Sequence, residues 1–144
     1  MPGSIRVPYT ELRNALGEST PRPILTVDLA YKGAKVRALG LVDSGADVNV
    51  LPYGIGAALG LDWGEQRFQL KLSGNLANFD TRVVILTVTV GDFSTVDLAF
   101  AWTQAEQVPL IFGQTNFFQT FNVCFFRSES YFTLTMKDAP QSGD

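Results

Sequence analysis

LVDSGA, residues 41–46, places a carboxylate directly after an apolar run that begins at Leu39. A continuous apolar run is typical of a buried strand, and a carboxylate at its end is costly unless hydrogen bonds hold it or chemistry requires it. Ser44 adds a hydroxyl, and Gly45 allows a tight turn and a close approach of the backbone to a ligand. Because Asp, Ser and Gly are also common turn residues, the tripeptide alone leaves an ordinary turn open.

The chain on both sides of this loop is patterned as short strands separated by turns. Residues 25–29 alternate between apolar and polar, and a turn at 31–34 leads into a second strand over 36–42. Further strands are expected over 79–90, 93–101, 108–112, 121–126 and 131–136, and helical segments over 10–16, 53–59 and 114–119. This spacing predicts an all-β barrel or sandwich whose body contains one or two short helices.

Composition favours a single folded domain. The 144 residues are 46% hydrophobic and 17% charged, which is enough apolar material for a core. The net charge is −3 and Lys and Arg do not cluster, so we expect no nucleic-acid partner. Signal-peptide and membrane-spanning patterns are absent from the sequence, and Cys124 is the single cysteine. We therefore expect a cytoplasmic protein or a soluble piece of a longer one.

Histidine is absent from the sequence, which narrows the chemistry. Ser-His-Asp and Cys-His nucleophilic sites both need an imidazole base. Zinc and iron sites built on histidine are also excluded, and one cysteine cannot form a thiolate cage. We expect no metal and no cofactor. If the protein is an enzyme, its acid and base groups are carboxylates, lysines or tyrosines.

Two motifs in a fixed order resemble the retropepsin-like aspartic proteases. The first is Arg22-Pro23-Ile24-Leu25-Thr26-Val27, followed after a glycine hairpin by residues 38–47 and by Val50-Leu51-Pro52. The second is Val108-Pro109-Leu110-Ile111-Phe112-Gly113, similar to the segment that crosses beneath the catalytic loop in that family. Residues 73–78 stand where the family carries its flap, and the resemblance covers roughly residues 22–120.

The resemblance implies an acid-protease barrel that is active as a two-fold homodimer on peptide or protein substrates. Asp43 is then the catalytic aspartate, because it is followed by Ser-Gly. No Ser/Thr-Gly pair follows Asp28, Asp62, Asp80, Asp92 or Asp97. The second carboxylate must come from a second copy of the chain. The domain is assigned to residues 22–136, with a leader over 1–21 and a tail over 137–144.

Roles of neighbouring residues follow from the same resemblance. Ser44 and Gly45 are expected to brace the catalytic loop. Gly45, Ala46 and Asp47 are expected to contact the substrate, and so is the flap. Its residues are Ser73, Gly74, Asn75 and Leu76. Cleft walls rich in Leu, Ile and Val imply a preference for apolar side chains beside the cut bond.

Dimer contacts are expected between Arg22 of one subunit and Asp47 of the other. Retroviral members often carry Arg after the downstream glycine, whereas this chain has the uncharged Gln114. We therefore expect Gln114 to contribute nothing to the usual charged network. The chain also continues into an extra C-terminal hairpin, which predicts a different dimer assembly.

Three other interpretations stay open at this level. The chain could keep the fold as a non-catalytic dimerisation or peptide-binding module, because fold does not imply function. It could also be another carboxylate hydrolase, although a glycosidase needs two acids about 5–10 Å apart. Asp47 could be no more than a solvated loop acid.

Overall fold

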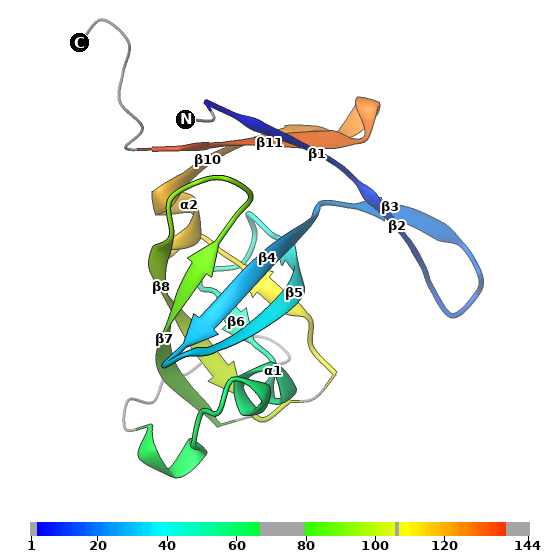
Figure 1. Ribbon diagram of the computed structural model, residues 1–144. Helices are drawn as coiled ribbons and strands as arrows, with labels where there is room; N and C mark the ends of the chain where they lie inside the picture. Colours follow the sequence, from blue (N-terminus) through cyan, green and yellow to red (C-terminus); the bar gives the residue numbers. More distant parts are fainter. Residues whose placement is uncertain (1–2, 67–79, 106, 138–144) are drawn as a thin grey trace, which may run out of the picture.

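A computed structural model describes residues 3–66, 80–105 and 107–137 of the chain (Figure 1). Its strands are β1 (Ile5–Pro8), β2 (Thr10–Arg13), β3 (Ser19–Arg22), β4 (Ile24–Tyr31), β5 (Ala34–Val42), β6 (Val50–Leu51), β7 (Thr81–Thr89), β8 (Val96–Thr103), β9 (Leu110–Phe112), β10 (Phe121–Phe126) and β11 (Tyr131–Met136). Its helices are α1 (Tyr53–Ala58) and α2 (Phe117–Thr120), with 3₁₀ turns at Trp63–Glu65 and Arg127–Glu129.

A closed barrel forms the body of the molecule. Its strands follow the order β4-β5-β9-β6-β8-β7, and β7 pairs back with β4 to close the ring. Most neighbours are antiparallel, whereas β5 and β9 run parallel, as do β6 and β8. The predicted all-β barrel is therefore confirmed, with α1 and α2 as its two short helices.

The hairpin of β4 and β5 follows directly from the sequence. Leu25, Val27 and Leu29 are buried, while the side chains between them lie nearer solvent. The turn at Lys32 and Gly33 has φ values of 46° and 88°, the left-handed pair that matches the twist of a two-residue hairpin. The turn therefore fixes the register in which every second side chain faces the core.

Aromatic side chains fill the barrel and its lower end. Phe100, Phe112 and Phe117 are essentially inaccessible, and the rings of Phe112 and Phe117 stack with centroids 4.6 Å apart. Helix α1 closes the lower end, where Tyr53 stacks on Trp102 with centroids 5.3 Å apart. This packing predicts that large-to-small changes at these rings cost several kcal/mol, about 3–5 each.

A second sheet, ordered β1-β11-β10, covers the upper end of the barrel (Figure 1). Phe132 and Leu134 on the central strand β11 are fully buried. Ile5 and Val7 on β1 lie opposite Leu134 and Phe132, respectively, and pack against the same core. Residues that we assign to the leader are thus part of this sheet, and β10–β11 is the predicted final hairpin.

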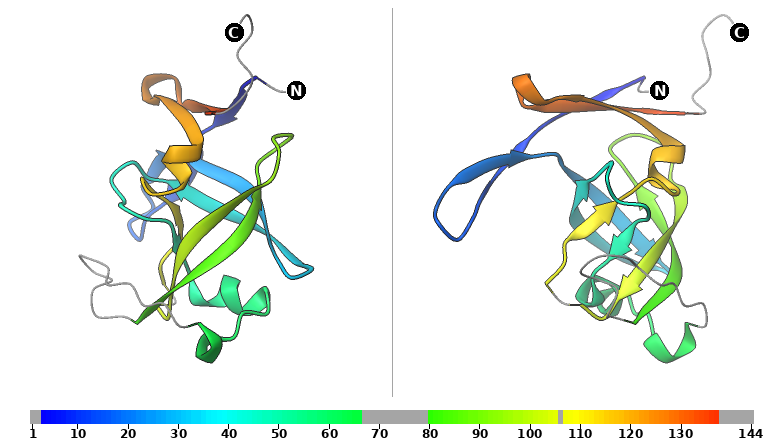
Figure 2. Two further views of the ribbon diagram at one scale, coloured as in Figure 1. Left: turned by 90° about the vertical axis from the view of Figure 1, so that its left-hand side faces the viewer. Right: turned by 180° about the vertical axis from the view of Figure 1, so that it is seen from behind.

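Strands β2 and β3 form a separate hairpin that projects away from the barrel (Figures 1 and 2). The helix predicted over residues 10–16 is wrong, because this segment forms β2 and the turn that follows. Leu12 and Leu16 have helical spacing, but both side chains are exposed. A helix here would therefore gain no stability from packing its apolar face. Within the described ranges, no helix is long and apolar enough to cross a membrane.

Candidate active site

Asp43 lies immediately beyond the end of β5, where backbone hydrogen bonds hold the chain from both sides. Its amide donates to the carbonyl of Phe112 on β9 at 3.0 Å. The preceding amide, that of Val42, donates to the carbonyl of Pro23 at 2.9 Å. Because β5 is parallel to β9, with Val42 opposite Phe112, the loop begins at a position fixed by two neighbouring segments.

The loop itself is a tight turn built around the Asp43 carboxylate. One carboxylate oxygen accepts a hydrogen bond from the amide of Gly45 at 2.9 Å. The carbonyl of Asp43 accepts from the amide of Ala46 at 3.1 Å. These bonds orient the carboxylate while leaving its side chain partly accessible, with an intermediate degree of burial.

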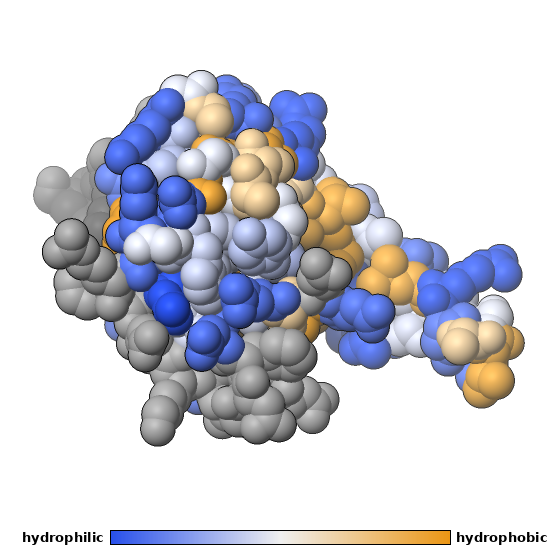
Figure 3. Space-filling model, turned by 90° about the horizontal axis from the view of Figure 1, so that it is seen from below, coloured by the Kyte–Doolittle hydropathy of each residue, from blue (hydrophilic) through white to orange (hydrophobic). Residues whose placement is uncertain are grey.

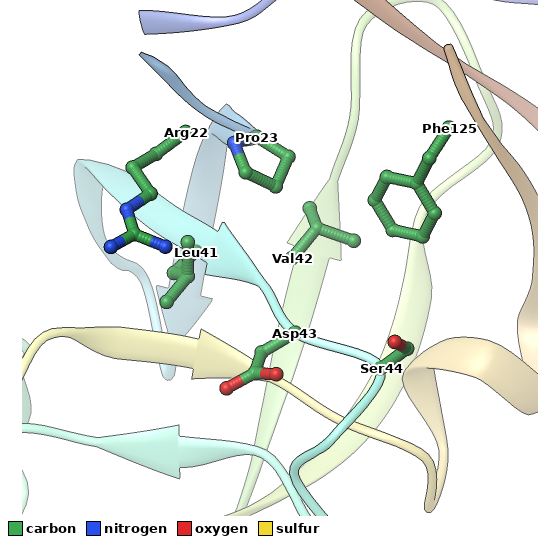
Figure 4. A pocket seen from close by; sticks show the side chains of 7 residues that line it. All are labelled: Arg22, Pro23, Leu41, Val42, Asp43, Ser44 and Phe125. Atoms are coloured by element: carbon green, nitrogen blue, oxygen red, sulfur yellow. The ribbon is translucent and has the colours of Figure 1, made fainter. Parts of the chain in front are cut away.

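A pocket of about 250 Å³ opens beside this carboxylate (Figure 4). Its walls come from three segments that are distant in the sequence: the end of β3, the β5 end with its loop, and β10. The lining residues are Arg22, Pro23, Leu41, Val42, Asp43, Ser44 and Phe125. Polar and apolar groups contribute about equally to its lining, and the polar side chains are those of Asp43, Arg22 and Ser44.

The segment that follows β9 is hydrogen-bonded to the loop of residues 43–47. The amide of Gln114 donates to the carbonyl of Ala46 at 2.8 Å, and that of Thr115 donates to the carbonyl of Asp47 at 2.9 Å. The Gln114 side-chain amide also donates to the carbonyl of Ser44 at 2.6 Å. A neutral side chain therefore braces the loop within the subunit, a role that the sequence reasoning did not assign to Gln114.

Asn49 is a second supporting residue that sequence reasoning missed. Its side chain is fully buried, accepts from the amide of Gly113 at 2.8 Å and donates to the carbonyl of Ala99 at 3.0 Å. Its own carbonyl accepts from the amide of Ala101 at 2.8 Å. The sequence feature that could have revealed this role is a single polar residue between Val48 and Val50. A polar side chain that is buried among apolar neighbours needs hydrogen-bond partners.

The structure describes six of the ten predicted site residues. Asp43, Ser44, Gly45, Ala46 and Asp47 form one continuous loop. The predicted flap residues, Ser73, Gly74, Asn75 and Leu76, lie outside the described residues.

The predicted dimer residues remain apart within one subunit. Arg22 and Asp47 are both exposed and form no ion pair with each other. The ion pair that the described residues do form joins Arg37 to Asp28 at 3.1 Å on the outer face of β4 and β5. There the hydrogen bond from Arg37 lowers the pKa of Asp28. In the described ranges, no group of three or more Cys, Asp or Glu side chains is placed to hold a metal.

Comparison with solved structures identifies the class of fold. The chain is similar to a retropepsin-like aspartic protease from Rickettsia conorii, with a TM-score of 0.59 and 14% identity over 93% of this chain and 91% of that one. It is also similar to EIAV protease complexed with the inhibitor HBY-793, with a TM-score of 0.50 and 19% identity over 71% of this chain and 88% of that one. No family model and no curated protein matches the sequence. The chain has the retropepsin-like fold, as the two motifs predicted.

Proposed function

We propose that the protein is an aspartic endopeptidase that acts as a homodimer, with one Asp43 from each subunit in a shared active site. The observation that carries the proposal is the position of Asp43. Its carboxylate is oriented by the Gly45 amide just beyond β5, a strand with one face in the core, and borders an open pocket. Aspartic proteases are among the solved structures that share this fold.

The chemistry requires two carboxylates in contact. Two neighbouring carboxylates share one proton, because both cannot ionise comfortably at that distance. The ionised Asp43 takes a proton from water as the water oxygen attacks the scissile carbonyl carbon. The protonated Asp43 donates its proton to the carbonyl oxygen, giving a tetrahedral diol. Collapse of the diol transfers a proton to the leaving amine and breaks the C–N bond, so neither a metal nor a covalent intermediate is needed.

Two features of the subunit support a second copy as the source of the other carboxylate. Asp43 is the one aspartate with the Asp-Ser-Gly context. Phe125, from β10 at the end of the sheet order, is 39% exposed and lines the Asp43 pocket. A two-fold axis beside this pocket would bury that ring and bring the two loops together.

Substrate binding is assigned to the same loop. Gly45 and Ala46 would lie along the peptide backbone, and Asp47 would orient it. The proposed flap, residues 73–78, would close over the peptide and exclude water. Apolar side chains beside the cut bond are the proposed preference, and a cytoplasmic location remains part of the proposal.

The test is a matched pair of variants assayed on a mixed peptide library. Asp43→Asn should reduce kcat/KM at least about 10³-fold, because it removes the group that moves protons. Asp92→Asn changes an exposed turn acid in the same way and should leave activity unchanged. Equal turnover by Asp43→Asn and wild type would refute the proposal. Peptide binding by wild type without any cleavage would instead identify a non-catalytic binding module.

A further inference from the structure

The hairpin of β2 and β3, which we call the arm, is exposed over most of its length. All ten residues from 10 to 19 are exposed, with Leu12 at 46% and Leu16 at 83%. Figure 3 shows the arm standing clear of the body, with apolar surface along it. An isolated two-stranded hairpin is marginally stable in water at best, so exposed leucines on such an element indicate a binding surface.

The arm is nevertheless a preformed structure. At its tip the side-chain oxygen of Asn14 accepts from the amides of Leu16 and Glu18, at 2.9 and 3.0 Å. Gly17 has a φ of 81°, the left-handed conformation that this turn requires. Ser19 also donates to the Glu11 carboxylate across the two strands. A partner therefore binds a surface that is already ordered, and binding costs little conformational entropy in the arm.

Both ends of the arm are fixed near the Asp43 pocket. Before β2, the amide of Tyr9 donates to the carbonyl of Ser130 at 2.8 Å, and its ring packs edge-on against Phe132. After β3, Pro23 accepts the hydrogen bond of Val42 and lines the pocket. The arm therefore extends from the rim of the candidate active site.

The face that carries Leu12 is continuous with this rim. Leu12 pairs with Thr20, and Thr10 pairs with Arg22. Residues two apart on a strand share a face, so Leu12 lies on the face that carries Arg22. Arg22 lines the Asp43 pocket, so this face leads directly into the region where a second subunit must approach.

We propose that the arm binds a second copy of this chain and that the two arms clasp the dimer symmetrically through Leu12 and Leu16. The inference rests on the proposed homodimer, whose two-fold axis must pass beside Asp43. A symmetric dimer then places both arms, and hence four leucines, in equivalent contacts. We assign a second copy of the chain as the binding partner because the face that bears Leu12 begins at the Asp43 pocket. That pocket requires a second subunit to supply the other carboxylate.

The experiment measures dimer dissociation by sedimentation in the Asp43→Asn background, which prevents self-cleavage. Leu12→Thr combined with Leu16→Ser should raise the dissociation constant by about a hundredfold, given the apolar area lost from two arms. Ile85→Thr is the control, because Ile85 is 55% exposed on β7, a barrel strand outside the Asp43 pocket. Amide hydrogen exchange of residues 10–19 should slow on dimerisation in the Asp43→Asn parent.

The possible outcomes distinguish failure of the proposed arm contact from failure of the proposed homodimer. An unchanged dissociation constant in the arm variant, with a dimeric parent, overturns the clasp and leaves the proposed protease intact. A parent that stays monomeric at all concentrations overturns both. Normal dimerisation with weaker cleavage of long peptides alone, assayed with Asp43 restored, would assign the arm to substrate binding and overturn the clasp. At a concentration where both proteins are monomeric, the unfolding temperature of the arm variant should match that of the parent, since residues 10–19 are exposed in the single subunit.

Discussion

The side-chain amide of Gln114 donates a hydrogen bond to the main-chain carbonyl of Ser44, with 2.6 Å between nitrogen and oxygen. It joins the segment after β9 to the residue next to the candidate catalytic aspartate. Together with the hydrogen bonds from the backbone amides of Gln114 and Thr115, it holds the loop of residues 43–47 in position. The position of Asp43 therefore depends on a residue about seventy positions later in the chain.

Gln114→Ala should lower kcat about two- to tenfold, the equivalent of one hydrogen bond of 0.5–1.5 kcal/mol. The loop keeps its backbone bonds but loses the brace at Ser44. Gln114→Arg should restore most of the activity, because a guanidinium can also donate to that carbonyl. Gln104→Ala, at an exposed glutamine, is the control. A loss of kcat in Gln114→Arg as large as in Gln114→Ala would contradict the role of this hydrogen bond.

Asn49→Ala should reduce the free energy of unfolding by about 2–5 kcal/mol. The change strands the buried amide of Gly113 and the carbonyl of Ala99, and each unpaired group costs about 1–3 kcal/mol. Asn122→Ala removes the same amide at an exposed site and should change stability by less than about 0.5 kcal/mol. Urea denaturation at one fixed protein concentration measures both, and similar midpoints would refute the argument.

Gly113→Ala should distort the catalytic loop and cost at least about 2 kcal/mol of stability. A Cβ at this position would lie 2.5 Å from the carbonyl oxygen of Val48 and 2.8 Å from that of Ala46. Both atoms belong to the backbone, so the loop has to move. Gly54→Ala meets nothing within 4 Å and should be neutral or stabilising in helix α1. Wild-type activity and stability in Gly113→Ala would show that the loop is more tolerant than its packing indicates.

Mixing wild type with excess Asp43→Asn should suppress wild-type activity if each active site needs two copies of Asp43. With a tenfold excess, random pairing leaves about one wild-type chain in ten with a wild-type partner. The measurement is initial rate at saturating peptide after the subunits have exchanged, with a tenfold excess of serum albumin as control. A rate per wild-type chain that is independent of the added variant would exclude the shared site.

Arg22 and Asp47 should be coupled across the dimer interface. Both side chains are exposed in the single subunit, which leaves each free to meet a partner chain. If the pair is partly buried in the dimer, loss of either partner should weaken the dimer by about 2–5 kcal/mol, because the other charge is left unpaired. The dimer constants of Arg22→Ala, Asp47→Ala and the double variant test this coupling. Strictly additive losses would show that the residues do not interact.

Much of the barrel could be predicted because its signals are local. Alternation in 25–29 and the Lys32-Gly33 turn each depend on residues within one hairpin. The apolar run into Asp43 does form a strand, but the expected burial is wrong at Leu39, which is 63% exposed. Short helices also followed local rules, as at α1, which ends before the left-handed Gly60. The same reasoning failed for residues 10–16, because leucines at helical spacing reveal nothing about whether a surface exists to bury them.

By itself the sequence determined the strand pattern of the β4–β5 hairpin, the absence of histidine chemistry and the single Asp-Ser-Gly loop. Those properties depend on residue type and on neighbours a few positions away. Only the tertiary structure decided which distant residues support that loop: Gln114 beneath Ser44, Asn49 beneath Gly113, and Phe125 beside Asp43. These contacts arise when a closed barrel and a covering sheet bring remote segments within hydrogen-bond distance, and no local pattern encodes that closure.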